Sequence, residues 1–187
     1  IHTTVIGYEN IPKDKPVLFI GNHRGFFDTI ISYSMMPGIT GFVAKKEIEK
    51  VPLLRVWMRY LHCLFLDRAN IKEGLKTILK GIDEVKAGVS MVIFPEGTRN
   101  KGDGIMPFKE GSFKIAEKSG CLIIPMVQNN TSAAFEDHFP FIRRTHTIIE
   151  FGSPIDLTTL SKEDRKAIGA YTHSIMLKMY EKNQSLV

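Results

Sequence analysis

The sequence places a histidine and an aspartate five positions apart, His23 and Asp28, just beyond a short apolar run at 17–21. A free imidazole titrates at about pH 6.5, and a neighbouring carboxylate fixes its tautomer and stabilises its cationic form. No Gly-x-Ser-x-Gly motif supplies a serine nucleophile. The pair therefore predicts a general base, His23, which Asp28 orients and which acts on a substrate hydroxyl. The alternative is a helix N-cap at Asp28 beside a histidine in a surface loop.

A second polar cluster, Glu96-Gly97-Thr98-Arg99, follows the apolar run at 91–94. A glycine lets the backbone approach a ligand closely, and the threonine and arginine offer donors suited to a phosphate. An ordinary turn with exposed charges would look similar. A Walker-type loop is excluded, because no G-x-x-x-x-G-K-[ST] motif occurs. Two such clusters after strand-like runs predict one site on one edge of a sheet.

The pair Lys45 and Lys46 closes a third strand-like run, where it either adds positive charge to the same edge or is merely solvated. No metal site is predicted, because the His-x-x-x-x-Asp spacing matches no common ligand pattern and the other histidines are scattered. Cys63 and Cys121 lie among apolar residues, which indicates reduced core thiols.

Short apolar runs alternate with helical patterns along the chain. The predicted strands cover residues 3–8, 17–21, 41–45, 63–66, 91–94, 122–127 and 145–151. Pro125 inside the sixth strand predicts an edge, a bulge or an early strand end. The alternation predicts an α/β fold: one domain over residues 1–187, with a mixed, largely parallel sheet flanked by helices. Ligands bind beyond the C-terminal ends of such strands, where both polar clusters lie.

The clearest predicted helix covers residues 71–87, with Asn70 as its N-cap and Glu73 as a capping-box partner. A second long helix is predicted from 162 to about 182, with Ser161 as its cap. Shorter helices are predicted at 28–35, 53–61 and 110–118.

The segment 53–61 has a basic amphipathic pattern. Leu54 and Trp57 share its apolar face, and Arg55 and Arg59 lie on another. Such a pattern suits a helix lying at an anionic bilayer surface. A surface helix that packs its apolar face on the core would show the same pattern, so both interpretations stay open.

Composition narrows the class of protein. The chain has 187 residues, of which 43% are hydrophobic and 24% charged, and these values are ordinary for one globular domain. The formal charge of +5 suits phosphate-bearing substrates, anionic lipid or nucleic acid. Nucleic-acid binding is disfavoured, because the basic residues are spread out without clustered aromatics on a basic strand face.

No apolar stretch approaches the roughly 18 residues that span a bilayer, and no signal peptide is visible. The chain begins at Ile1, directly in a strand-like run, rather than at a methionine. We expect from this start a processed or truncated form that lacks an N-terminal membrane-associating segment.

Taken in order, four blocks of the chain resemble the motifs of the glycerolipid acyltransferase family, in particular of 1-acyl-glycerol-3-phosphate acyltransferases. The family pattern is N-H-x-x-x-x-D, then K-K-E, then F-P-E-G-T-R, then an apolar block with a proline. The corresponding blocks are residues 22–28, 45–47, 94–99 and 123–126, with supporting matches at 66–68 and 108–113. The resemblance covers residues 16–127 and is weak beyond them.

The resemblance implies roles for individual residues. His23 would deprotonate the free hydroxyl of a lysophosphatidic acid, and Asp28 would hold His23 in place. Arg99, with Gly97, Thr98 and Lys46, would bind the acceptor phosphate. Glu96 would position the acceptor or tune Arg99, and Pro125 would shape the acyl or donor site.

The resemblance also implies partners. The donor would be an acyl-CoA or an acyl-carrier protein, and no resident cofactor is expected. The acceptor would be a lysophospholipid, and the enzyme would be membrane-associated at the cytoplasmic face, without nucleic acid.

This chain departs from the family pattern at two positions. Gly25 stands where many members have serine, and Arg55 stands where a small residue is common. Neither position belongs to the expected base or phosphate site, but both leave the acceptor and the acyl pocket open. Acylation of glycerol-3-phosphate or of another lysophospholipid stays open, as does an inactive lipid-binding member at an anionic membrane surface.

Overall fold

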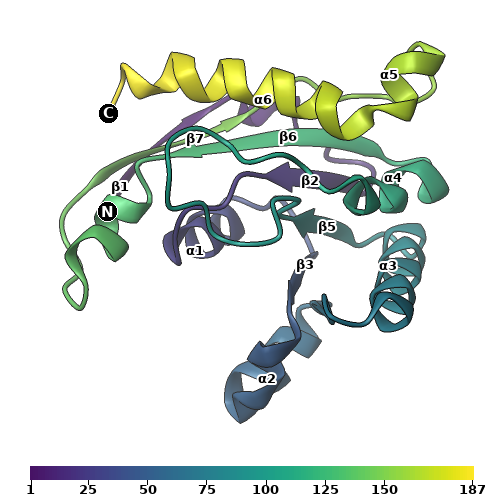
Figure 1. The fold of residues 1–187 in the computed structure, drawn as a ribbon, viewed down its shortest axis with the longest axis horizontal. Helices are drawn as coiled ribbons and strands as arrows, with labels where there is room; N and C mark the ends of the chain where they lie inside the picture. Colours follow the sequence, from purple (N-terminus) through teal and green to yellow (C-terminus); the bar gives the residue numbers. More distant parts are fainter.

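Seven apolar runs form one sheet in the computed structural model, which describes all residues 1–187 (Figure 1). The sheet order is β1-β7-β6-β2-β5-β3-β4, and all neighbours pair in parallel except β6 and β7. The predicted α/β fold with a mixed, largely parallel sheet is therefore confirmed. The strands are β1 (His2–Ile6), β2 (Val17–Gly21), β3 (Thr40–Lys45), β4 (Leu64–Leu66), β5 (Ser90–Ile93), β6 (Leu122–Asn129) and β7 (His146–Phe151).

Helices cover both faces of the sheet, so the central strands are apolar on both sides. In β2, Leu18 and Ile20 pack into one core cluster, and Val17 and Phe19 pack into the other. This alternation follows from the two-residue period of a strand, and continuous burial is typical of parallel strands between two helical layers. The first cluster lies under α3 (Ile71–Lys86), α4 (Lys114–Ser119) and α6 (Ile168–Gln184).

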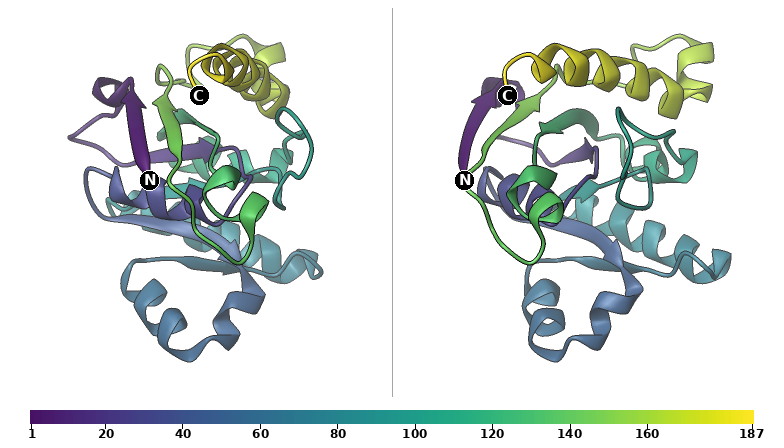
Figure 2. Two further views of the ribbon diagram at one scale, coloured as in Figure 1. Left: turned by 90° about the vertical axis from the view of Figure 1, so that its left-hand side faces the viewer. Right: turned by 60° about the vertical axis from the view of Figure 1, so that its left-hand side comes forward.

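The second cluster lies under α1 (Phe27–Ser34) and α2 (Pro52–Tyr60). Figure 2 shows α6 along one side of the molecule and α2 projecting from the opposite side. None of the helices is both long enough and apolar enough to cross a bilayer.

The helix ends agree with the sequence except in three details, one of which is that residues 110–113 of the predicted helix 110–118 form a 3₁₀ turn ahead of α4. Asn70 caps α3 by accepting the amides of Lys72 and Glu73. The predicted capping-box role of Glu73 is wrong, because Asp67 accepts the Asn70 amide at 3.2 Å instead. The predicted helix from residue 162 is interrupted after α5 (Lys162–Lys166), whose cap is Ser161 as expected, and α6 follows.

Pro125 lies inside β6 without ending it. Met126 pairs with Phe151 of β7, whereas Ile123 pairs with Ile155. The segment 151–155 that runs beside β6 therefore contains one more residue between these two pairs than β6 does. This is a bulge opposite Pro125, one of the three outcomes that the proline predicted. The proline needs no ladder donor there, and its carbonyl still accepts the Gly152 amide at 2.8 Å.

The two cysteines are free thiols. Cys63 is buried and Cys121 is partly buried, and burial raises the pKa of both thiols. A raised pKa disfavours the reactive thiolate, in agreement with the predicted core role.

Candidate active site

The two polar clusters meet at one edge of the sheet. Strands β2, β5, β3 and β4 run in parallel, so their C-terminal ends lie together. His23 follows β2 and Glu96 follows β5. The loop after β5 folds back over this edge, where the amide of Asn100 donates to the carbonyl of His23 at 2.7 Å. The predicted common edge is therefore what the fold produces.

His23 and Asp28 are in direct contact. The Nδ1 atom of His23 lies 2.7 Å from Oδ2 of Asp28. The side chain of Asp28 is 1% exposed, and that of His23 is 19% exposed. Because an ionised carboxylate only accepts hydrogen bonds, the shared proton belongs on Nδ1 and the lone pair on Nε2. No group of the chain hydrogen-bonds Nε2, so this nitrogen can accept a proton from a ligand.

The carboxylate of Asp28 is held from several sides. Its Oδ2 atom accepts the amides of Arg24 at 2.6 Å and Gly25 at 2.7 Å. The buried hydroxyl of Thr131 donates to Oδ1. Asp28 lies inside the first turn of α1, and Phe26 occupies the N-cap. The alternative interpretation, an N-cap aspartate beside an unconnected histidine, is therefore wrong.

The ring of His23 is also fixed on its face and through its backbone. The ring stacks on Phe94 with 4.5 Å between the ring centroids. Its backbone amide donates to Oε1 of Glu96 at 2.7 Å. The imidazole thus has one orientation, which a general base needs before substrate arrives.

Glu96 binds backbone rather than the phosphate side of the site. Oε1 accepts the His23 amide, and Oε2 accepts the Met106 amide at 3.0 Å. These bonds join the end of β2 to the loop after β5. Burial raises the pKa of Glu96. Both oxygens of Glu96 are therefore occupied by backbone amides, and its part in positioning the acceptor or tuning Arg99 stays a prediction.

Gly97 lets cationic side chains approach the turn closely. Its φ of +77° is in the left-handed region, and a Cβ atom there would lie 2.7 Å from Nζ of Lys109. The guanidinium of Arg68 donates to the carbonyl of Gly97. Any other residue at this position would therefore be strained and would displace Lys109.

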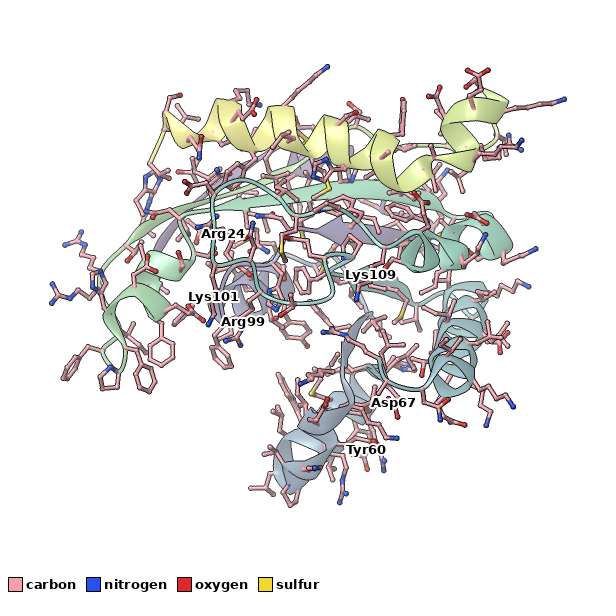
Figure 3. All side chains as sticks on the ribbon, in the orientation of Figure 1. Arg24, Tyr60, Asp67, Arg99, Lys101 and Lys109 are labelled. Carbon is pink, nitrogen blue, oxygen red and sulfur yellow. The ribbon has the colours of Figure 1, made fainter.

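Three cationic residues, Arg99, Lys109 and Arg68, surround the turn, and all three are exposed. Figure 3 shows Arg99, Lys101 and Lys109 around the loop after β5. Thr98 is exposed in the same turn. Arg99 has one carboxylate neighbour, Glu136, with 3.5 Å between Nη1 and Oε1.

Lys46 is already paired. Its Nζ atom lies 2.9 Å from Oδ2 of Asp67, and this hydrogen bond raises the pKa of Lys46. The structure therefore gives the lysine a carboxylate partner at the ends of β3 and β4. A phosphate would have to compete with Asp67 for it.

Pro125 does not lie with these groups. It is buried in β6 and pairs with Ile20, which precedes His23 by three residues. Its contribution to an acyl or donor site stays a prediction.

Four residues of the site, Arg68, Lys109, Thr131 and Glu136, are not among the predicted site residues. Arg68 and Lys109 lie in blocks that already supported the family resemblance, so a signal existed for them. Thr131 and Glu136 lie beyond residue 127, where the resemblance is weak. Only the fold brings these two beside Asp28 and Arg99, from segments more than 30 residues away.

The site and fold define a class of protein: an α/β domain with a histidine–aspartate pair and a cationic turn on one sheet edge. Comparisons with known proteins identify the family. The model described as "Acyltransferase" matches residues 2–129, so the chain belongs to the acyltransferase family.

Relatives from yeast and bacteria agree with this assignment. A Saccharomyces cerevisiae protein named 1-acyl-sn-glycerol-3-phosphate acyltransferase is 31% identical over 95% of this chain and 58% of its own length. A Haemophilus influenzae protein of the same name is 32% identical over 90% of this chain and 71% of its own length. The chain thus spans 58% and 71% of these two relatives.

The fold also matches a solved structure. The crystal structure of the 1-acyl-sn-glycerophosphate (LPA) acyltransferase PlsC from Thermotoga maritima superposes with a TM-score of 0.85 and 26% identity. The match covers 98% of this chain and 72% of that protein.

Proposed function

We propose that this chain transfers a fatty acyl group from an acyl thioester to the sn-2 hydroxyl of 1-acyl-glycerol-3-phosphate, giving phosphatidic acid. The observation that carries the proposal is the oriented imidazole, with Nδ1 on Asp28 and Nε2 free, next to a cationic turn. The names of the relatives support the choice of acceptor.

The reaction needs no acyl-enzyme. Nε2 of His23 takes the proton of the acceptor hydroxyl as the oxygen attacks the thioester carbonyl carbon. The tetrahedral intermediate collapses with cleavage of the carbon–sulfur bond, and the imidazolium returns its proton to the thiolate. Asp28 stabilises the imidazolium during this cycle. No serine or cysteine contacts the imidazole, in keeping with direct transfer between two bound substrates.

The phosphate of the acceptor binds at the exposed cationic turn. Arg99 offers two parallel N–H donors to a phosphate, and Lys109 adds a point charge beside Gly97. Arg68 and Thr98 complete the set, and Lys46 contributes after exchange with Asp67. Glu96 acts as a positioning residue for the histidine and the loop.

The donor is an acyl-CoA or an acyl-carrier protein, and direct transfer between the two substrates requires no resident cofactor. An acceptor with a long acyl chain lies in a lipid layer, so catalysis takes place at a membrane surface. We place this membrane surface at the cytoplasmic face.

Release of free thiol from a long-chain acyl-CoA tests the proposal. We expect release to depend on 1-acyl-glycerol-3-phosphate and to fall at least about tenfold when 1-monoacylglycerol replaces it, because the phosphate contacts are charged. Equal release with both acceptors would contradict a phosphate site at the cationic turn. Preference for lysophosphatidylcholine or glycerol-3-phosphate would point to acylation of that acceptor instead. Tight lipid binding without thiol release from either donor class would favour an inactive lipid-binding protein.

A further inference from the structure

A loop near the site exposes three large apolar side chains. It follows the short turn Glu136–His138, and Phe139, Phe141 and Ile142 are 75%, 69% and 66% exposed. Three such side chains within four residues exceed the scattered apolar exposure of an ordinary soluble surface. We name residues 139–144 the aromatic loop.

The aromatic loop is held by ring contacts and by backbone hydrogen bonds. The rings of Phe135 and Phe139 meet edge to face with centroids 5.4 Å apart. The amide of Phe141 donates to the His138 carbonyl at 2.9 Å, and the amide of Arg143 donates to the Ala134 carbonyl at 3.0 Å. The fold therefore holds these apolar side chains outward.

Two arginines close the aromatic loop. Arg143 and Arg144 are both exposed, and no carboxylate lies within 4.0 Å of either guanidinium. Aromatic side chains followed by unpaired arginines are typical of segments that enter the interfacial region of an anionic bilayer.

An apolar stripe connects the aromatic loop to α2. The amide of Phe26 donates to Glu136 at the root of the loop, with 2.6 Å between the two atoms. Phe26, Ile30 and Tyr33 follow helical spacing along α1, and all three are exposed. The ring of Tyr33 then meets Trp57 of α2 at 6.0 Å.

Helix α2 packs one apolar side on the core and exposes another. Met58 and Leu61 pack against the second core cluster. Leu53, Trp57 and Tyr60 remain 88%, 54% and 81% exposed. The helix is thus fixed on the core by one side and presents a second apolar side to its surroundings.

The aromatic loop and α2 lie on the same lower half of the molecule in Figures 1 and 2. In Figure 3, Arg99 and Lys101 lie between the two. Arg99 of the cationic turn reaches the root of the aromatic loop, where its Nη1 atom lies 3.5 Å from Oε1 of Glu136.

We infer that the aromatic loop, the outer stripe of α1 and the outer side of α2 form one docking face for an anionic lipid bilayer. Apolar side chains enter the interface, and Arg143 and Arg144 meet anionic headgroups. Docking on this face places the cationic turn at headgroup level, where an acceptor phosphate lies. The inference rests on the proposed function for the lipid acceptor, but lipid binding itself requires no turnover.

Vesicle binding by the whole chain tests the inference. Vesicles of phosphatidylcholine with about one-third phosphatidylglycerol are sedimented with wild type and with the triple variant F139S/F141S/I142S. We expect the triple variant to lose at least tenfold in partitioning, because three apolar anchors are removed. The variant R143Q/R144Q should lose most of the preference for anionic over pure phosphatidylcholine vesicles, because about 1 kcal/mol per arginine corresponds to roughly fivefold each.

The control is Leu186→Ser, which removes an exposed leucine beside the C terminus, on the opposite half of the molecule. It should bind vesicles as wild type does. The sole tryptophan, Trp57, reports on α2, and its emission should shift to the blue on anionic vesicles for wild type and the control. Wild-type partitioning by the triple variant, or an equal loss in Leu186→Ser, would overturn the inference.

Activity measurements distinguish a failure of the docking face from a failure of the proposed function. With a short-chain acceptor below its micellar concentration, the triple variant should release thiol at the wild-type rate. With long-chain acceptor in anionic vesicles, its rate should fall along with its binding. Lack of thiol release by wild type that still binds vesicles would count against the proposed function and leave the docking face standing. A loss of rate by the triple variant on the soluble acceptor would count against the docking face, because it would show damage to the site itself.

Discussion

The base and the cationic turn occupy one sheet edge but are built differently. The Asp28 carboxylate is 1% exposed and accepts from the His23 ring, two backbone amides and Thr131. The Arg99 side chain is 47% exposed, and its one carboxylate neighbour lies at 3.5 Å. The proposed base is therefore fixed before substrate binds, whereas the proposed phosphate site can rearrange around its ligand. Changes to the base should lower kcat, and changes to the turn should raise the KM for the acceptor.

The largest effect among the neighbours of the base is expected for Asp28→Asn. The neutral side-chain amide of asparagine has one accepting oxygen in place of two, and it no longer stabilises a histidine cation. We expect kcat to fall by about 100-fold or more, with less than a threefold change in the KM for the acceptor.

Asp67→Asn is the matched control, because it removes a carboxylate from the same edge without contact to His23. It should keep kcat within threefold of wild type. Thermal unfolding of both variants separates chemistry from stability. An Asp28→Asn protein of wild-type stability and undiminished kcat would contradict the role of the carboxylate.

Arg99→Gln should raise the KM for the acceptor rather than lower kcat. Loss of a charged hydrogen bond to phosphate is worth about 1.5–3 kcal/mol, which corresponds to roughly a 10- to 150-fold increase in the KM for the acceptor. We expect kcat at saturating acceptor to change by less than threefold. Arg165→Gln, at a distant helix, should leave both parameters unchanged. A fall in kcat without a change in KM would place Arg99 with the base instead.

Gly25→Ala changes a position between the proposed base and the cationic turn. The new Cβ atom would lie 2.7 Å from Oε2 of Glu136, so the carboxylate must move away from Phe26 and Arg99. Freed from a competing carboxylate, Arg99 should bind phosphate about two- to fivefold more tightly, the range of an exposed ion pair. Steady-state kinetics should show this as a lower KM for the acceptor.

Glu136→Ala should reproduce that change, and the double variant should match either single variant. Additive effects in the double-mutant cycle would show that the two positions act separately.

The smallest expected effect is on stability and concerns Glu96. Its pKa is raised by burial, so the folded state binds the proton more tightly than the unfolded state, whose reference pKa is 4.5. This contribution to stability is fully present below that reference value and is lost as the pH rises through the folded pKa.

The free energy of unfolding of wild type, relative to Glu96→Gln, should therefore be largest in acid and decline toward neutral pH. Urea titrations at several pH values measure this difference, and other titrating groups cancel between the two proteins. A difference in unfolding free energy between wild type and Glu96→Gln that grows with pH would contradict the expected decline.

Much of this arrangement could be predicted from local sequence. Every predicted strand is present with ends within two residues, because buried parallel strands are short continuous apolar runs. The contact of His23 and Asp28 was also predicted, because their spacing lets a single turn join them.

Other features depend on contacts between distant segments. Thr131 reaches Asp28 only because β6 lies beside β2 in the sheet. Lys46 was expected at the phosphate, and only the neighbouring end of β4 shows that Asp67 holds it. No local pattern separates a carboxylate that faces a ligand from one, such as Glu96, that binds backbone amides.

Steady-state thiol release by His23→Gln, with saturating acyl-CoA and 1-acyl-glycerol-3-phosphate, tests the central claim most directly. The amide cannot take the acceptor proton, so we expect kcat to fall at least about 100-fold, with the KM for the acceptor within threefold of wild type. A folded variant that keeps kcat within threefold of wild type would contradict His23 as the base.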